Sequence, residues 1–162
     1  MLILHCILGL QSQIIDFTNA FAQADIPSGG PVFIELPRDF KSDGGKHDAV
    51  LKLKKSLYAQ AEAAHLWYEK LRNVLLERGF LISKVDPCLF MSKNVIFVVY
   101  VDDCLFWACS KSEIDNVMKS FREDGASYNW EHSKGESVYE FLGIDIKTLD
   151  DGGFQFCQTG LI

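Results

Sequence analysis

Two adjacent aspartates, Asp102 and Asp103, stand inside an otherwise apolar run of the sequence. The residues before them, 95–99, and those after them, 104–109, are β-branched, aromatic or otherwise apolar. This pattern predicts two strands that are buried on both faces and joined at the aspartates. Because two carboxylates are costly to bury without a partner, they favour an exposed turn or a bound cation. The sequence therefore predicts a hairpin whose tip is either a polar turn or a divalent-metal site.

A third carboxylate, Asp16, ends a short strand predicted over residues 13–16. Taken alone, an aspartate in this place is equally well explained as a strand-end or capping residue. Magnesium prefers hard oxygen ligands, and one or two carboxylates together with substrate phosphates commonly hold it. If this strand lies beside the hairpin, Asp16, Asp102 and Asp103 form a donor set for Mg²⁺, with Mn²⁺ as an alternative ion. Two such ions can bind both the attacking and the leaving oxygen of a phosphoryl transfer.

The elements that position these acids alternate between strands and helices. Apolar residues at helical spacing predict a helix over residues 56–78, which Gly79 ends. A second helix is predicted from Ser110 to near Gly125, with Ser110 and Glu113 as a capping box. Further strands are predicted over residues 32–36, 50–54, 88–91, 139–147 and 154–158.

The predicted order of strand, helix, hairpin, helix and strand is that of a split β-α-β arrangement. This arrangement places the first strand beside the hairpin in one antiparallel sheet, which two helices cover. The predicted fold class is therefore α+β. In this layout Asp16 lies beside the tip that carries Asp102 and Asp103.

Charge and cysteine content restrict the class of protein. The chain has 162 residues and a formal net charge of −6, which argues against binding nucleic acid mainly through bulk positive charge. Its five cysteines are scattered without a CxxC pair, so neither a zinc ribbon nor a disulfide framework is predicted. An intracellular, reducing setting fits this cysteine usage. The apolar stretch around the aspartates is broken by charge, so neither a membrane span nor a membrane partner is expected.

Four ordered motifs resemble the reverse transcriptase of copia-type long-terminal-repeat retrotransposons. A Tyr-x-Asp-Asp sequence alone is weakly specific, but four motifs in this order and at this spacing are strongly specific. The likeness extends from Ile14 to the last residue of the chain. The motifs are 16–21 followed by 32–37, 51–58 followed by Trp67-Tyr68, 86–90 followed by Tyr100-Val101-Asp102-Asp103, and 139–146 followed by Gln158.

The resemblance implies the palm of an RNA-directed DNA polymerase. Residues 1–162 would be a partial reverse transcriptase domain that is mostly palm, with the fingers largely missing and the chain ending near the start of the thumb. Asp16 and Asp102 would ligate two Mg²⁺ ions, with Asp103 as a third acid, while the primer 3′-hydroxyl attacks the α-phosphate of a nucleotide. The implied partners are an RNA or DNA template with its primer, deoxynucleoside triphosphates and the remaining domains of the polyprotein. The implied location is a cytoplasmic particle or the nucleus.

The resemblance also assigns residues to substrate binding. Phe21 stands where the family places an aromatic steric gate against the ribose 2′-hydroxyl, although from the residues alone a core phenylalanine is an equally good explanation. As bare residues, the pair at positions 142 and 143 is equally an ordinary strand with a kink. The complete set is Phe21, Tyr58 and Ala59 at the nucleotide, Tyr100 near the primer terminus, and Leu142 and Gly143 in the primer-gripping hairpin.

The second motif departs from the family pattern, which reads Ser-Leu-Tyr-Gly-Leu-Lys-Gln-Ala-Pro. Ala59 replaces the glycine, Ala61 the lysine and Ala64 the proline. Glycine permits a close backbone approach that a Cβ atom obstructs. Loss of the lysine, with Glu62 beside it, removes positive charge where a triphosphate is expected.

Three hypotheses follow from these features. The first is a polymerase palm that, on its own, is expected to be inactive or weakly active. The second is an inactive relic of a decayed element, which the three alanines favour. The third is an RNA-binding module that uses exposed sheet aromatics, but Phe97 and Phe106 lie in continuous apolar runs and are expected to be buried.

Overall fold

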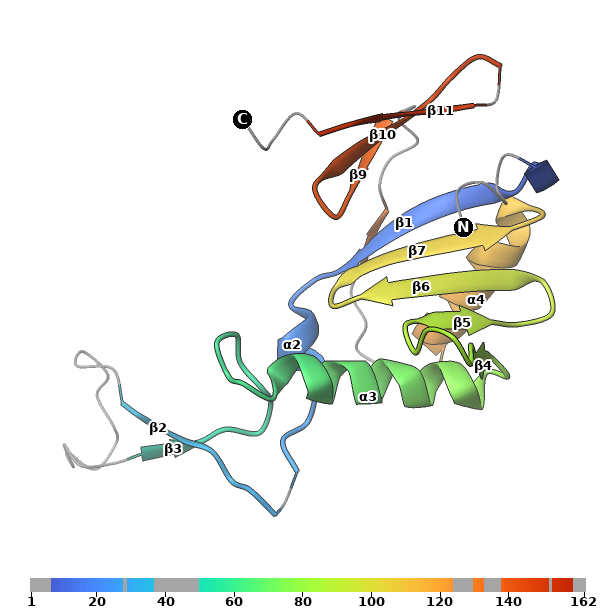
Figure 1. The fold of residues 1–162 in the computed structure, drawn as a ribbon. Helices are drawn as coiled ribbons and strands as arrows, with labels where there is room; N and C mark the ends of the chain where they lie inside the picture. The colour runs from blue at the N-terminus through green and yellow to red at the C-terminus, as the bar shows by residue number, and fades with distance from the viewer. Residues whose placement is uncertain are drawn as a thin grey trace. The chain divides into compact units, whose positions relative to one another are not determined.

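The computed structural model describes residues 7–27, 29–36, 50–123, 130–132, 138–151 and 153–158. For Asp16, residues 122–123, 130–132 and 138–140, and Thr148 it describes the backbone only. The elements are mixed helices and strands, so the predicted α+β class is confirmed. The chain divides into two compact units, Met1–Thr18 with Leu71–Ile162, and Asn19–Lys70. Figure 1 shows the elements of both units in chain order.

The larger unit is built on a six-stranded antiparallel sheet in the order β4-β5-β6-β7-β1-β8. Strand β1 pairs with β7, so the predicted position of the first strand beside the hairpin is confirmed. The β-branched and aromatic residues of the two hairpin strands suit a pleated surface that packs on both sides. The strands are β1 (Gln11–Phe17), β4 (Leu81–Ile82), β5 (Leu89–Met91), β6 (Val95–Tyr100), β7 (Asp103–Ala108) and β8 (Trp130–His132).

The β6-β7 hairpin supplies much of the core. Residues 104–108 of β7 are all buried, which confirms burial on both faces for this strand. Strand β6 alternates between buried and half-buried residues, so it is fully covered on one face only. On that face the rings of Phe97 and Phe106 lie 4.0 Å apart between centroids. The other face carries a buried cluster formed by Leu10, Ile14, Leu105 and Trp107, against which Phe141 packs.

Helix α3 (Ala63–Glu77) begins seven residues later than predicted. The helix predicted from residue 56 is therefore wrong over its first two turns. Ala59 has a φ of 71°, in the left-handed region, which an α-helix does not include. The predicted end is confirmed, since Gly79 has a φ of 78° and its N–H donates to the carbonyl of Leu76 at 2.9 Å.

Helix α4 (Lys111–Glu123) packs against strands β7 and β1. It begins with one half of the predicted capping box, because the N–H of Ser110 donates to Oε2 of Glu113 at 3.1 Å. The N–H of Glu113 donates to the carbonyl of Ser110 at 3.2 Å rather than to its hydroxyl. The predicted end near Gly125 lies outside the described residues. No helix in the described parts of the chain is long and apolar enough to cross a lipid bilayer.

The single strand predicted after α4 is wrong, because the chain forms a hairpin there. Strands β9 (Val138–Phe141) and β10 (Ile144–Thr148) pair with each other, and Leu142 and Gly143 form the two-residue turn between them. Both turn residues have positive φ, 55° and 72°, as a type I′ hairpin turn requires. The predicted return strand is confirmed as β11 (Phe154–Cys157), which pairs with β10.

The smaller unit contains a short helix that the sequence did not predict. Helix α2 (Ala20–Gln23) follows Asn19, which has a φ of 54°. Strands β2 (Phe33–Glu35) and β3 (Val50–Lys52) pair as antiparallel neighbours. The strand predicted over residues 32–36 is therefore confirmed over its central residues, and the strand predicted over residues 50–54 over its first three.

Candidate active site

The register of the central sheet brings the backbones of the three predicted acids to one end. Tyr100 and Asp103 are paired where β6 ends and β7 begins, so Val101 and Asp102 form the turn between them. On the other side of β7, Asp16 of β1 is the register partner of Asp103. Directly paired positions in antiparallel strands belong to the same face of the sheet. Asp16, Asp102 and Asp103 are therefore placed together by strand pairing rather than by proximity in sequence.

The turn presents its residues at the surface with a strained backbone. Tyr100 is 56% exposed, whereas Asp102 and Asp103 are half-buried. Val101 has a φ of 58°, and the left-handed region costs an L-residue roughly 1–2 kcal/mol. Such strain persists only where the surrounding structure enforces it. Sequence reasoning missed it because valine rarely adopts this conformation, so the residue type gave no signal of it.

The donor atoms at this tip suit a hard divalent cation. Among the side chains that the structure describes, which do not include that of Asp16, no group of three or more His, Cys, Asp or Glu residues could hold a metal ion. Asp102 and Asp103 nevertheless supply two carboxylates, and Mg²⁺ is commonly held by one or two carboxylates completed by substrate phosphates and water. The residues present thus fit magnesium bound together with its substrate.

The predicted primer-gripping residues lie on a hairpin that is anchored to the same sheet. Leu142 and Gly143 are exposed in the β9-β10 turn. The residue before them, Phe141, packs against the cluster that includes Ile14 and Leu105. Ile14 lies two positions from Asp16 in β1, and Leu105 lies two positions from Asp103 in β7. Each therefore belongs to the same face of its strand as the acid. The hairpin contacts the face of the sheet to which the acids belong.

Two predicted nucleotide-binding residues pack against each other in the smaller unit. The ring centroids of Phe21 and Tyr58 are 4.6 Å apart, and the ring planes are tilted by 45°. Phe21 is half-buried and Tyr58 is 51% exposed. The two rings therefore form a paired aromatic surface that is accessible to a ligand.

Ala59 occupies a conformation that favours glycine. Its φ of 71° lies in the left-handed region, where the Cβ atom of an L-residue clashes with the backbone. The family pattern has glycine at this position, and glycine adopts the left-handed region at no steric cost. The positive φ at position 59 gives a physical reason for the glycine in the family pattern. In this chain Ala59 holds the same conformation with backbone strain.

Replacing Ala59 with glycine is expected to raise the free energy of unfolding by about 1 kcal/mol, because the relief of left-handed strain exceeds the added entropy of the unfolded chain. Urea denaturation followed by circular dichroism measures this change. Ala61→Gly is the matched control, since Ala61 is exposed in the same segment without a positive φ. Equal destabilisation by both substitutions would contradict the left-handed assignment.

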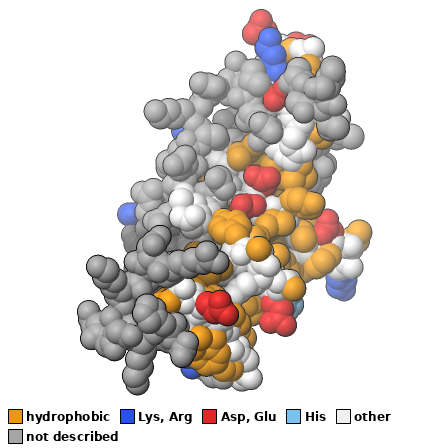
Figure 2. Space-filling model, turned by 90° about the vertical axis from the view of Figure 1, so that its left-hand side faces the viewer, with side chains coloured by type: hydrophobic (Ala, Val, Ile, Leu, Met, Phe, Trp, Pro, Cys, Tyr) orange, Lys and Arg blue, Asp and Glu red, His pale blue; other side chains and the backbone are white. Residues whose placement is uncertain are grey.

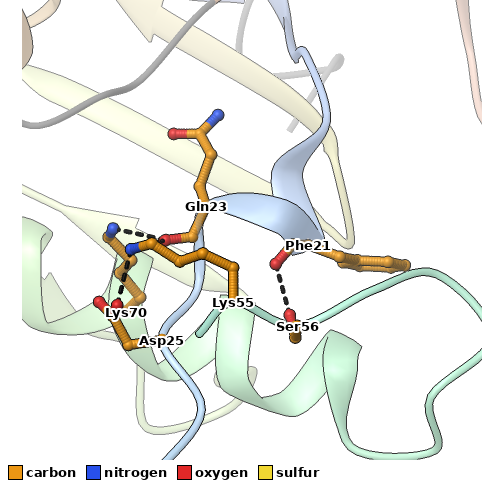
Figure 3. Close-up of polar contacts among 6 residues, drawn as sticks. All are labelled: Phe21, Gln23, Asp25, Lys55, Ser56 and Lys70. Carbon is orange, nitrogen blue, oxygen red and sulfur yellow. Dashed lines mark hydrogen bonds and ion pairs between the residues drawn. The ribbon is translucent and has the colours of Figure 1, made fainter. Parts of the chain in front are cut away.

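Two lysines converge on the carbonyl of Gln23, where helix α2 ends (Figure 3). Lys55 and Lys70 donate to this oxygen from Nζ at 3.2 and 2.8 Å. Lys55 also pairs with Asp25 at 2.7 Å, and the hydrogen bond that it donates lowers the pKa of that carboxyl. Burial, and secondarily the charge of Lys55, lowers the pKa of Lys70. Sequence reasoning missed this cluster because its members are far apart along the chain.

The face of the molecule shown in Figure 2 is not broadly basic where its residues are described. On the face shown in Figure 2, acidic side chains are set among hydrophobic ones. This distribution agrees with the net charge of −6. Any binding of nucleic acid by this chain therefore depends on localised contacts rather than on a general positive field.

Comparison with known sequences assigns the class of protein. Residues 8–162 match the family described as reverse transcriptase (RNA-dependent DNA polymerase). The chain belongs to this family, and the family predicted from the four motifs is confirmed. Its relatives are of the copia type of retrotransposon.

Three relatives illustrate the likeness. The Retrovirus-related Pol polyprotein from transposon RE1 of Arabidopsis thaliana is 32% identical over 142 residues, which are 85% of this chain and 9% of the relative. The corresponding polyprotein from transposon TNT 1-94 of Nicotiana tabacum is 34% identical over 123 residues, or 70% and 9%. The Transposon Ty1-DR5 Gag-Pol polyprotein of Saccharomyces cerevisiae is 28% identical over 138 residues, or 82% and 7%. The chain thus spans less than a tenth of the length of these relatives.

Proposed function

We propose that this chain is the palm region of an RNA-directed DNA polymerase, which transfers nucleotides to a primer 3′-hydroxyl. The observation that carries the proposal is the register of the central sheet, which pairs Asp16 with Asp103 and leaves Asp102 in the adjoining turn. Membership of the reverse transcriptase family supports the reaction class. The order β6-β7-β1 supports the split β-α-β palm, with α3 and α4 as its two helices.

In this proposal Asp16 and Asp102 bind divalent metal, and Asp103 is the third acid. Magnesium, when bound, would align the hydroxyl with the α-phosphate and neutralise the charge that develops there. Tyr100, exposed beside the turn, contacts the primer terminus, and the β9-β10 turn grips the primer strand. The template, the deoxynucleoside triphosphates and the other domains of the polyprotein are the proposed partners.

The smaller unit carries the residues that the proposal assigns to nucleotide binding. Phe21 limits the space at the ribose 2′ position, and Tyr58 and Ala59 line the nucleotide. Two observations support these roles: the rings of Phe21 and Tyr58 pack against each other, and the Tyr58 side chain is exposed.

Primer extension tests the proposal directly. The 162-residue chain is incubated with a primed RNA or DNA template and deoxynucleoside triphosphates, in Mg²⁺ or Mn²⁺. We expect weak extension that depends on the metal and disappears on chelation with EDTA. Extension that continues in EDTA would overturn the assignment of the acids as metal ligands.

The second candidate is an inactive relic, which the strained Ala59 favours. An alanine held at a φ of 71° places a Cβ atom where the family has none. Absence of extension in both Mg²⁺ and Mn²⁺, for the chain and for its Ala59→Gly variant, would support the relic. The burial of Phe97 and Phe106, both 0% exposed as predicted, argues against RNA binding through these two aromatics of the central sheet.

A further inference from the structure

We propose that Ser56 is a positioning residue for Phe21, and that it thereby helps to set the discrimination between deoxyribonucleotides and ribonucleotides. The inference rests on the proposed function of Phe21 as the group that limits space at the ribose 2′ position. It concerns a residue that contacts no substrate and acts through the backbone of helix α2.

Ser56 connects its own segment to the end of helix α2 through both of its hydrogen-bond donors. The side chain is 0% exposed, and its hydroxyl donates to the carbonyl oxygen of Phe21 (Figure 3). Its backbone N–H donates to the carbonyl oxygen of Ala24 at 3.0 Å. A buried serine that binds one short helix through two separate groups fixes the position of that helix relative to residues 55–58.

Helix α2 needs such external support. It has four residues, and Asn19 at its start makes no side-chain capping hydrogen bond. Isolated helices of this length are unstable, because few internal hydrogen bonds offset the loss of backbone freedom. The carbonyl of Phe21 accepts one bond within this segment, from Ala24 N–H at 3.1 Å, and the hydroxyl of Ser56 supplies a second. The conformation at Phe21 therefore depends on Ser56.

The same segment also contacts the ring of Phe21. Tyr58 is two residues beyond Ser56, and its ring lies 4.6 Å from that of Phe21. Ser56 thus fixes the backbone from which the Phe21 ring projects, while Tyr58 packs against the ring itself. Steric rejection of a single hydroxyl requires the rejecting group to be held in place, since displacement by about 1 Å changes rates by as much as a hundredfold.

The test compares Ser56→Ala with wild type in single-nucleotide primer extension, with deoxyribonucleotide or ribonucleotide as substrate. The measured quantity is kcat/KM for the deoxyribonucleotide divided by kcat/KM for the ribonucleotide. We expect this ratio to fall by about tenfold in Ser56→Ala, mainly because KM for the ribonucleotide falls. Ser56→Thr retains the hydroxyl and is expected to restore the ratio. Ser112→Ala, which removes an exposed serine of α4, is the matched control. An unchanged ratio in a folded Ser56→Ala variant would overturn the proposal.

A second measurement makes the inference independent of polymerase activity. In the wild-type chain, NMR is expected to show nuclear Overhauser contacts between the Phe21 and Tyr58 rings and slow exchange of the Ala24 amide. Ser56→Ala should weaken both. If neither the wild-type chain nor its Ala59→Gly variant extends the primer, the proposed function fails, and these signals alone decide the positioning role. Unchanged ring contacts and exchange in Ser56→Ala would refute it.

Discussion

Replacement of Asp102 by asparagine is expected to reduce primer extension by about a thousandfold or more. An amide keeps the size of the carboxylate but not its charge, so the tip would lose the proposed metal ligand, which would be worth several kcal/mol in the transition state. Asp102 is half-buried in the turn next to Asp103, so its carboxylate is open to solvent, as the proposed metal role requires. The rate of incorporation under single-turnover conditions is the appropriate measurement.

The matched control is Asp115→Asn, which makes the same change at an exposed position of helix α4. It should leave extension within about twofold, because it alters net charge without touching the tip. Paramagnetic Mn²⁺ provides a readout that needs no turnover, since it should broaden the amide signals of residues 100–103 in wild type but not in Asp102→Asn. Equal activity of the two variants would exclude Asp102 as a metal ligand.

The position of the acids could be predicted because it follows from pairing rules rather than from details. The continuous apolar runs on both sides of Asp102 and Asp103 predicted two central strands, and the split β-α-β order placed Asp16 beside them. The observed register pairs Asp16 with Asp103. The capping box at Ser110 was equally predictable, because it depends on residues three positions apart.

The misplaced start of α3 and the undivided strand after α4 share one physical cause, which is positive φ at residues other than glycine. Ala59 delays the start of α3, and Leu142 divides a predicted strand into a hairpin. Val101 strains the turn that carries Asp102. Alanine, leucine and valine all disfavour this conformation, so local preference points away from it and only the surrounding fold enforces it.

Contacts between distant polar groups were also beyond the sequence. Lys70 and Gln23 are separated by 47 positions, and Ser56 and Phe21 by 35. Nothing in the type or spacing of these residues marks them as partners. The consequence is that the acids of the site were predictable from the sequence, whereas the support beneath Phe21 was visible only in the structure.

Truncation of Arg78 to alanine is expected to lower the free energy of unfolding by about 2–3 kcal/mol, because it removes several charge-assisted hydrogen bonds and a cation–π contact. From the end of α3, its guanidinium donates to the carbonyl of Val74 at 2.9 Å and to Ser120 of α4, at 3.1 Å for both the hydroxyl and the carbonyl. Its Cζ also lies 4.6 Å from the centre of the Phe121 ring. Arg78 therefore joins the end of α3 to α4, and urea denaturation measures the cost of its loss.

Lysine at position 78 separates charge from geometry. It keeps the positive charge but cannot reproduce the planar fork that bonds Val74 and Ser120 together, so Arg78→Lys should recover less than half of the lost stability. Arg72→Ala is the matched control, since that guanidinium bonds to its neighbour Asn73 at the surface of the same helix. It should cost less than about 1 kcal/mol.

Because α4 packs on β7 and β1, the strands that carry Asp103 and Asp16, Arg78→Ala should also weaken Mn²⁺ broadening at the tip. Full stability in Arg78→Lys would show that charge alone joins the helices.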